Sequence, residues 1–205
     1  MSKLYFIGGA QRSGKTTVIQ RLIERKPMLA ASTDAIRNVA KGVTNPEERP
    51  KLHKVDRGEY DSPKHMEMMR EDPQAVLLHE TLQSEEVWKS TLDFIGYYHR
   101  DGKDAAIEGV AVLPKEVAKL EYEYSAIFLA PKGDQTKTIL EHAKNNEFDW
   151  LHKYDDEVIK SFCDFIKHWN SYYSAEAKMA GLTIVEIDPD NFDTSINKAV
   201  DILLN

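Results

Sequence analysis

The sequence predicts an α/β fold in which a five-stranded parallel sheet is covered by helices on both faces. Short, wholly apolar segments recur along the 205 residues, and such segments are typical of strands buried on both faces. Polar or glycine-bearing turns follow them, and segments with the apolar spacing of helices lie between them. Because strands that alternate with helices are joined by right-handed crossovers, we expect one parallel sheet in a single domain spanning residues 1–205.

The first half of the predicted sheet begins near the N-terminus. Residues 4–7 are all apolar and predict the first strand. Residues 15–26 carry apolar side chains at helical spacing, and a proline ends that helix. Residues 28–32 predict the second strand, and we expect Thr33 and Asp34 to cap the helix that follows.

The middle of the chain departs from this alternation. Residues 41–73 are charged and rich in proline, and they are too many for a plain connection. Residues 75–100 regain the apolar spacing of a helix. We therefore interpret residues 41–102 as a helical insertion.

The second half of the chain completes the alternation. The predicted strands lie at residues 105–107, 126–129 and 182–187, and the predicted helices at residues 135–179 and 194–204. The first of these helical regions contains a candidate break near Asn145 and Asn146.

Composition limits the partners and the compartment. The 27 Lys and Arg residues face 34 Asp and Glu residues, for a formal net charge of −7, so no broad positive field is expected and nucleic acid is not predicted as a partner. Cys163 is the one cysteine and cannot form an internal disulfide. The chain begins with a short polar stretch and then a strand, and no run approaches the length of a membrane span. We expect a cytoplasmic protein with no membrane partner.

A phosphate-binding motif lies between the first strand and the first helix. The residues Gly9-Ala10-Gln11-Arg12-Ser13-Gly14-Lys15-Thr16 match the P-loop pattern at every fixed position. In that pattern, backbone N–H groups at a helix N-terminus bind phosphate oxygens. We expect Lys15 to bridge the β- and γ-phosphates and Thr16 to ligate Mg²⁺. The sequence therefore predicts a P-loop NTPase fold that binds ATP and Mg²⁺ through the motif and the adjoining Thr17.

Two polar residues follow the second strand. Asp34 lies at its end, and Arg37 lies one helical turn later on the same face. Ligands of open parallel sheets gather at the carboxyl edge, so Asp34 is a candidate to take the proton of a substrate hydroxyl, and Arg37 to bind a phosphate or carboxylate. The alternative is a helix cap beside an exposed arginine.

Glu108 and Gly109 follow the third strand in the same way. Glu108 is a candidate catalytic residue that orients the water shell of Mg²⁺ or contacts the substrate, and Gly109 leaves room beside it. The alternative is an ordinary turn glutamate. The segment Asp188-Pro189-Asp190, after the fifth strand, is interpreted as a plain turn rather than as a neighbour of the nucleotide base.

Three segments together resemble a known family. The P-loop, Ser32-Thr33-Asp34-Ala35-Ile36-Arg37 and Ile107-Glu108-Gly109-Val110 look like the small P-loop kinases of the nucleoside-monophosphate-kinase-like group, especially the 2-phosphoglycerate-kinase-like and zeta-toxin-like members. The resemblance implies that residues 41–102 hold the phosphoryl acceptor and that residues 131–155 form a lid. It also implies that Asp34 contacts or deprotonates the acceptor hydroxyl. The implied activity is transfer of the γ-phosphoryl group of MgATP to a hydroxyl or phosphate of a small, anionic metabolite.

The chain departs from that family at the lid. The lids of these kinases supply arginines, whereas no arginine follows Arg100 here. The candidates to replace them are Lys132, Lys137, Lys144 and Lys153 as point charges, or Arg12 in the P-loop, and we expect neither to reproduce the planar fork that a lid arginine presents to the transition state. Two other functions stay open, a nucleotide hydrolase and a nucleotide-binding regulatory protein with little turnover. The guanine-binding pattern of GTPases is missed by one residue at 197–201.

Overall fold

The computed structural model describes residues 2–53 and 63–205, so residues 54–62 of the predicted insertion lie outside the described residues. The elements follow one another in this order: β1 (Leu4–Gly8), α1 (Lys15–Arg25), β2 (Leu29–Ser32), α2 (Thr33–Val43), α3 (Pro50–His53), α4 (Pro63–Glu71), α5 (Pro73–Arg100), β3 (Ala105–Glu108), α6 (Pro114–Val117), β4 (Tyr124–Pro131), α7 (Thr136–Asn145), α8 (Asp156–Met179), β5 (Thr183–Ile187) and α9 (Phe192–Leu204). Short 3₁₀ helices at Trp150–Lys153 and Pro189–Asn191 precede α8 and α9.

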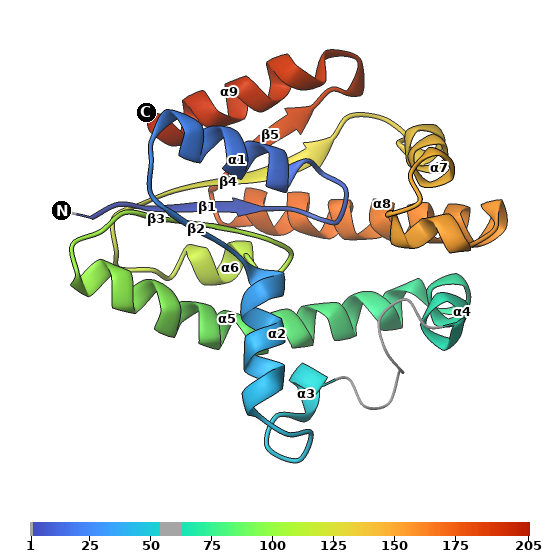
Figure 1. The fold of residues 1–205 in the computed structure, drawn as a ribbon, viewed down its shortest axis with the longest axis horizontal. Helices are drawn as coiled ribbons and strands as arrows, with labels where there is room; N and C mark the ends of the chain where they lie inside the picture. The colour runs from blue at the N-terminus through green and yellow to red at the C-terminus, as the bar shows by residue number, and fades with distance from the viewer. Residues whose placement is uncertain (1, 54–62) are drawn as a thin grey trace.

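The five strands form one parallel sheet in the order β2-β3-β1-β4-β5 (Figure 1). This confirms the predicted fold class. Because β1 lies between β3 and β4, the chain adds strands on one side of β1 and then on the other. In open α/β sheets, ligands bind at the carboxyl ends of the strands beside such a switch point.

Apolar side chains of the sheet pack against helices on both of its faces. Along β1, Leu4 and Phe6 belong to one buried cluster and Tyr5 and Ile7 to the other, as the alternation of a strand requires. Helices α1 and α9 cover the second face, and α5 and α8 lie on the first (Figure 1). The sheet is therefore the middle of three layers, with helices packed on each of its faces.

Helix α5 belongs partly to this core. Trp88 and Ile95, in its second half, are buried in the same cluster as Phe6. The helices α2, α3 and α4 pack on α5, which thereby carries the rest of the segment after β2 (Figure 1). The segment is thus anchored to the sheet by its longest helix.

The predicted cap of α2 was wrong by one residue. The Ser32 hydroxyl caps the helix by accepting a hydrogen bond from the Ala35 N–H group at 3.1 Å. The Thr33 hydroxyl instead accepts the Ala111 N–H group at 3.3 Å, across the sheet edge. Asp34 is therefore not needed as a cap, and its carboxylate is available for another role.

Within residues 2–53 and 63–205, none of the helices combines the length and the apolar character needed to cross a membrane.

Candidate active site

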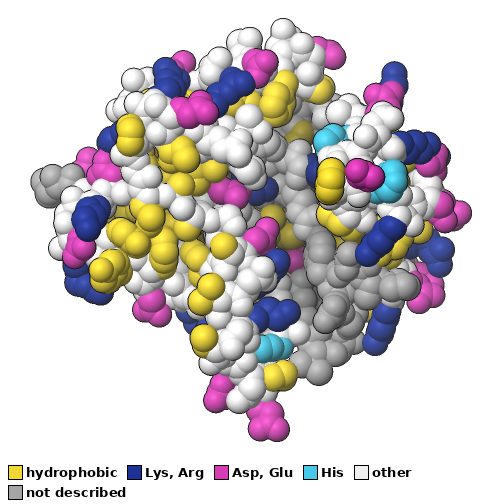
Figure 2. All heavy atoms as spheres, viewed as in Figure 1, with side chains coloured by type: hydrophobic (Ala, Val, Ile, Leu, Met, Phe, Trp, Pro, Cys, Tyr) yellow, Lys and Arg dark blue, Asp and Glu magenta, His cyan; other side chains and the backbone are white. Residues whose placement is uncertain are grey.

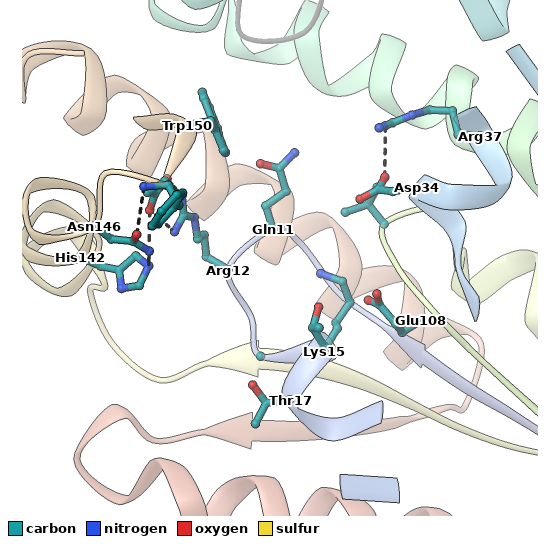
Figure 3. Close-up of a pocket in the computed structure, with 15 residues that line it drawn as sticks. Gln11, Arg12, Lys15, Thr17, Asp34, Arg37, Glu108, His142, Asn146 and Trp150 are labelled. Carbon is teal, nitrogen blue, oxygen red and sulfur yellow. Dashed lines mark hydrogen bonds and ion pairs between the residues drawn. The ribbon is translucent and has the colours of Figure 1, made fainter. Parts of the chain in front are cut away.

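A pocket of about 560 Å³ opens at the carboxyl end of β1. Of the predicted site residues, its wall contains Gln11, Arg12, Gly14, Lys15, Thr16, Thr17, Asp34, Arg37 and Glu108. Figure 3 shows Arg12 on one side, the Asp34 and Arg37 pair on the other, and Lys15 and Glu108 between them. The pocket therefore brings together side chains from three predicted motifs.

Four predicted residues lie outside this wall, and they support it from beneath. Ala10 and Ser13 are buried in the P-loop. Gly9 has a φ angle of 138°, and a Cβ there would lie 2.8 Å from the Leu129 carbonyl oxygen. Gly109 donates its N–H group to the Ile7 carbonyl oxygen at 3.1 Å, which ties the end of β3 to β1. These contacts hold the loop close to the sheet, where only glycine fits at position 9.

The P-loop leads into α1 through Gly14, which has a left-handed backbone with a φ angle of 94°. No side chain caps this helix N-terminus. Its first backbone N–H groups and the positive end of the helix dipole are therefore the features that bind phosphate oxygens in such loops. Thr16 and Thr17 stand on this first turn, in the pocket wall.

Lys15 lies folded against the P-loop. Its Nζ atom donates to the Ala10 carbonyl oxygen at 2.6 Å, and the side chain is buried. Burial lowers the pKa of Lys15 because the charged form loses water, and the negative charges of Glu108 and Asp34 oppose this. A bound polyphosphate would place negative charge next to the buried Lys15 ammonium group and so stabilise its charged form.

Glu108 is set between two strands that lead to the other site residues. In the sheet it is paired with Ile7 of β1 and with Ser32 of β2. Burial raises the pKa of Glu108, the positive charge of Lys15 opposes the shift, and the negative charge of Asp34 adds to it. This is not an exposed turn glutamate, because the residue is buried in the pocket wall.

Asp34 and Arg37 form an ion pair on the first turns of α2. The Arg37 Nη1 atom lies 3.2 Å from Asp34 Oδ1, and both residues line the pocket (Figure 3). Glu80, Gln83 and Ser84 of α5 line a small cavity behind this pair. The predicted common face of the two residues is therefore confirmed, and α5 supports it from behind.

The pocket wall also contains residues that the sequence did not predict, from α7 and the loop after it. They are His142, Asn146, Phe148, Asp149 and Trp150. Asp149 accepts two hydrogen bonds from the Arg12 guanidinium, at 2.6 and 2.8 Å. Two signals in the sequence pointed to this segment: the candidate break near Asn145, where α7 ends, and the family resemblance, which implied a lid over residues 131–155.

Asp149 is a well-held carboxylate. Burial alone would raise its pKa, but hydrogen bonds from Arg12 and from the Leu151 N–H group outweigh burial and lower it. The imidazole of His142 lies 3.6 Å from the same carboxylate. The segment after α7 is thereby fixed to the P-loop by a charged contact.

A second pocket, of about 390 Å³, adjoins the first at Arg12, Gly14 and His142. The apolar residues of its wall are Pro131, Ile139, Ile187, Pro189 and Phe192. The turn after β5, interpreted from the sequence as a plain turn, therefore contributes Pro189 to a pocket. Asp188 of that turn pairs with Lys132 at 3.0 Å.

The site has the oxygen atoms that Mg²⁺ prefers. Thr16, which carries a hydroxyl group, and Glu108, which carries a carboxylate, both belong to the pocket wall. Among the described residues, no three His, Cys, Asp or Glu side chains gather in a way that could hold a metal ion. Thr16 and Glu108 fit a magnesium ion whose other ligands would be phosphate oxygens of the nucleotide and water.

Acidic and basic side chains are intermixed on the face of the molecule shown in Figure 2. The composition likewise combines 27 Lys and Arg residues with 34 Asp and Glu residues.

The parallel sheet, its strand order and the phosphate-binding loop after β1 define a P-loop NTPase fold. Three solved structures share it over nearly the whole chain. A shikimate kinase from Bacteroides thetaiotaomicron matches with a TM-score of 0.56 and 12% identity, covering 98% of each chain. An uncharacterized protein from Eubacterium ventriosum matches with a TM-score of 0.53 and 14% identity, covering 99% of this chain and 98% of the other. A sugar kinase from Janibacter sp. matches with a TM-score of 0.52 and 13% identity, covering 99% and 95%.

No protein-family model matches the sequence, and a search of curated proteins finds no match. The similarity therefore identifies the fold, and the function has to be argued from the site.

Proposed function

We propose that this protein is an ATP-dependent kinase that transfers the γ-phosphoryl group of MgATP to a hydroxyl or phosphate of a small, anionic metabolite. One observation carries the proposal. A single pocket joins the P-loop with Lys15 to the Asp34 and Arg37 pair, and Glu108 lies between them (Figure 3). A nucleotide-binding loop and a separate acid–base and anion-binding pair are the two halves that a phosphotransferase needs.

On the nucleotide side, backbone N–H groups of the P-loop and of the first turn of α1 bind the phosphates. Lys15 exchanges its hydrogen bond to the Ala10 carbonyl for the β- and γ-phosphate oxygens. Thr16 and Glu108 would hold Mg²⁺ and its water shell, and the bound ion neutralises charge on the phosphates. The second pocket, which has Ile139, Ile187 and Phe192 in its wall, would accept the nucleotide base.

On the acceptor side, Arg37 binds the anionic group of the metabolite, and Asp34 accepts the proton of the attacking hydroxyl. The acceptor oxygen forms a bond to the γ-phosphorus as the bond from that phosphorus to the bridging oxygen breaks. ADP leaves with the electrons of the broken bond, and the proton passes from Asp34 to water. When the acceptor is itself a phosphate group, no proton has to be removed.

Other observations support a small acceptor. The pocket of about 560 Å³ is of the size that binds small molecules. Two of the similar structures are described as a shikimate kinase and a sugar kinase, which supports a small-molecule acceptor without naming it. The fold and the site together favour a phosphotransferase over a binding module.

The test is ADP release from MgATP, measured with and without a panel of small anionic and hydroxylated metabolites. A kinase releases ADP at a rate that depends on one acceptor or a few related ones. Basal release that no acceptor changes would indicate a hydrolase. Tight nucleotide binding with no release would indicate a regulatory protein. Lys15→Ala serves as the inactive control, because the side chain binds phosphate rather than filling the core.

A further inference from the structure

The second arginine of the pocket, Arg12, lies where the two pockets meet. It lines both the phosphate pocket, of about 560 Å³, and the neighbouring pocket of about 390 Å³. In Figure 3 it reaches from the P-loop toward the loop after α7, on the side away from Asp34. Since Arg37 pairs with Asp34, Arg12 is the arginine of the wall that stands on the nucleotide side.

The backbone at Arg12 is unusual. Its φ angle is 63°, and among the described residues it is the one non-glycine residue with a positive φ. This conformation disfavours any side chain with a Cβ atom, and glycine would adopt it freely. An arginine at this position therefore carries a conformational cost, and such strained residues often occur at functional sites.

The Arg12 guanidinium has more hydrogen-bond donors than its contact with Asp149 uses. Two of its five N–H groups bind Asp149, through Nη1 at 2.8 Å and Nη2 at 2.6 Å. In the described part of the chain no further hydrogen bond of this group is found. The Arg12 side chain is 24% exposed, whereas the Asp149 side chain is 2% exposed. The buried carboxylate thus holds one edge of a planar fork, and the remaining N–H groups can bind another anion.

The lysines of residues 131–155 do not serve this purpose. Lys132 pairs with Asp188 at 3.0 Å, and Lys144 pairs with Asp156 at 2.7 Å. Lys137 is highly exposed on α7 and faces Glu141, and Lys153 lies over the Tyr154 ring. None of them belongs to the wall of the phosphate pocket. The charge that a lid arginine would supply has to come from elsewhere.

We propose that Arg12 supplies that charge from within the P-loop, and that Asp149 is the residue that positions it. This inference rests on the proposed kinase activity. During transfer, negative charge spreads over the γ-phosphoryl oxygens while the bond to the ADP oxygen breaks and the bond to the acceptor oxygen forms. The unused N–H groups of Arg12 stabilise that charge. Asp149 keeps the fork in place and so links the 131–155 segment to the reacting phosphate.

The test compares kcat, KM for ATP and binding of two probes, MgADP and MgADP with aluminium fluoride. For Arg12→Ala we expect roughly a 10³-fold loss of kcat, the scale of a transition-state arginine, with MgADP affinity nearly unchanged. The tighter binding that aluminium fluoride adds should be lost. Arg12→Lys should recover little, because lysine lacks the planar fork.

Asp149 needs its own variants. Asp149→Ala should lower kcat by roughly 10²-fold through misplacement of Arg12, leave KM for ATP nearly unchanged, and be partly rescued in Asp149→Glu. Arg12→Ala leaves a buried carboxylate without its partner, so the double variant Arg12→Ala with Asp149→Asn removes that charge and keeps the test valid if the single variant unfolds. Arg25→Ala is the matched control, because it removes an arginine of an exposed ion pair with Asp201.

The outcomes separate the two proposals. Wild-type kcat in Arg12→Ala, or an equal loss of affinity for both probes, overturns the role of Arg12. If the wild-type protein itself shows no acceptor-dependent ADP release, the proposed kinase activity fails first. Both proposals stand if the wild-type protein and Arg25→Ala release ADP in the presence of the acceptor and Arg12→Ala does not.

Discussion

The Thr33 hydroxyl occupies the space that a side chain at position 109 would need. A Cβ at Gly109 would lie 1.8 Å from Thr33 Oγ1, and Gly109 has a φ angle of 145°. The same hydroxyl accepts the Ala111 N–H group. This contact joins the loop after β3 to the start of α2, next to Glu108 and Asp34.

Gly109→Ala should therefore disturb both stability and the site. The clash and the unfavourable φ angle are expected to cost about 2 kcal/mol or more, which lowers Tm by about 4–8 °C. Thermal unfolding measures the loss. Gly102→Ala is the control, because its φ is also positive but a Cβ there meets no atom within 4 Å. An equal effect of the two substitutions would show that the Thr33 contact contributes nothing.

Asp34→Asn tests the general base. If Asp34 accepts the proton of a hydroxyl acceptor, kcat should fall by roughly 10²-fold or more while ATP affinity stays nearly unchanged. Steady-state kinetics with the acceptor from the screen measures both quantities. Since Ser32 caps α2, Tm should change little. A lowered Tm with normal kcat would assign Asp34 a purely structural role.

Arg37→Ala tests the anion site. Loss of a charged hydrogen bond to the acceptor should raise the acceptor KM by roughly 10- to 100-fold and leave the KM for ATP nearly unchanged. The acceptor KM of Arg37→Lys should lie between those of the wild-type protein and Arg37→Ala, since lysine keeps the positive charge but lacks the planar guanidinium. An equal rise in the KM for ATP and the KM for the acceptor would contradict a role of Arg37 in binding the acceptor alone.

The pH dependence of stability should reveal Glu108. Burial raises its pKa above the ordinary value of 4.5, so between these two values the folded protein holds a proton that the unfolded chain has lost. The wild-type protein therefore loses stability as pH rises from about 4.5 through the raised pKa. Glu108→Gln has no such proton. Its unfolding midpoint in urea, relative to that of the wild-type protein, should therefore rise as pH rises through this range. A difference that does not vary with pH would mean that burial does not perturb Glu108.

The strands and the P-loop could be predicted because their signals are local. The apolar run of β1, the glycines and Lys15 are adjacent in the sequence, and the helix spacing that follows needs no distant information. Glu108 could be predicted for the same reason, since it ends a strand. The choice of Ser32 over Thr33 as cap could not, because both residue types cap helices and a distant contact with Ala111 decides between them.

The pairing of Arg12 with Asp149 in the loop after α7 could not be predicted either, although the family resemblance implied a lid over residues 131–155. Arg12 and Asp149 are 137 positions apart, and no pattern in the sequence connects an arginine in a P-loop to an aspartate before a short 3₁₀ helix. The short helices α3 and α6, with 4 residues each, were missed because they are too brief to show a periodic apolar face. Contacts set by the fold, rather than by neighbours in sequence, decide such features.

The most direct test of kinase activity follows the γ-phosphoryl group itself. The wild-type protein is incubated with Mg²⁺, ATP labelled with ¹⁸O on the γ-phosphoryl oxygens, and the acceptor that promotes ADP release, and the products are analysed by mass spectrometry. The proposal predicts that the label moves to the acceptor with the whole phosphoryl group, and that Lys15→Ala abolishes the transfer. Label found in inorganic phosphate alone, with an unmodified acceptor, would contradict it.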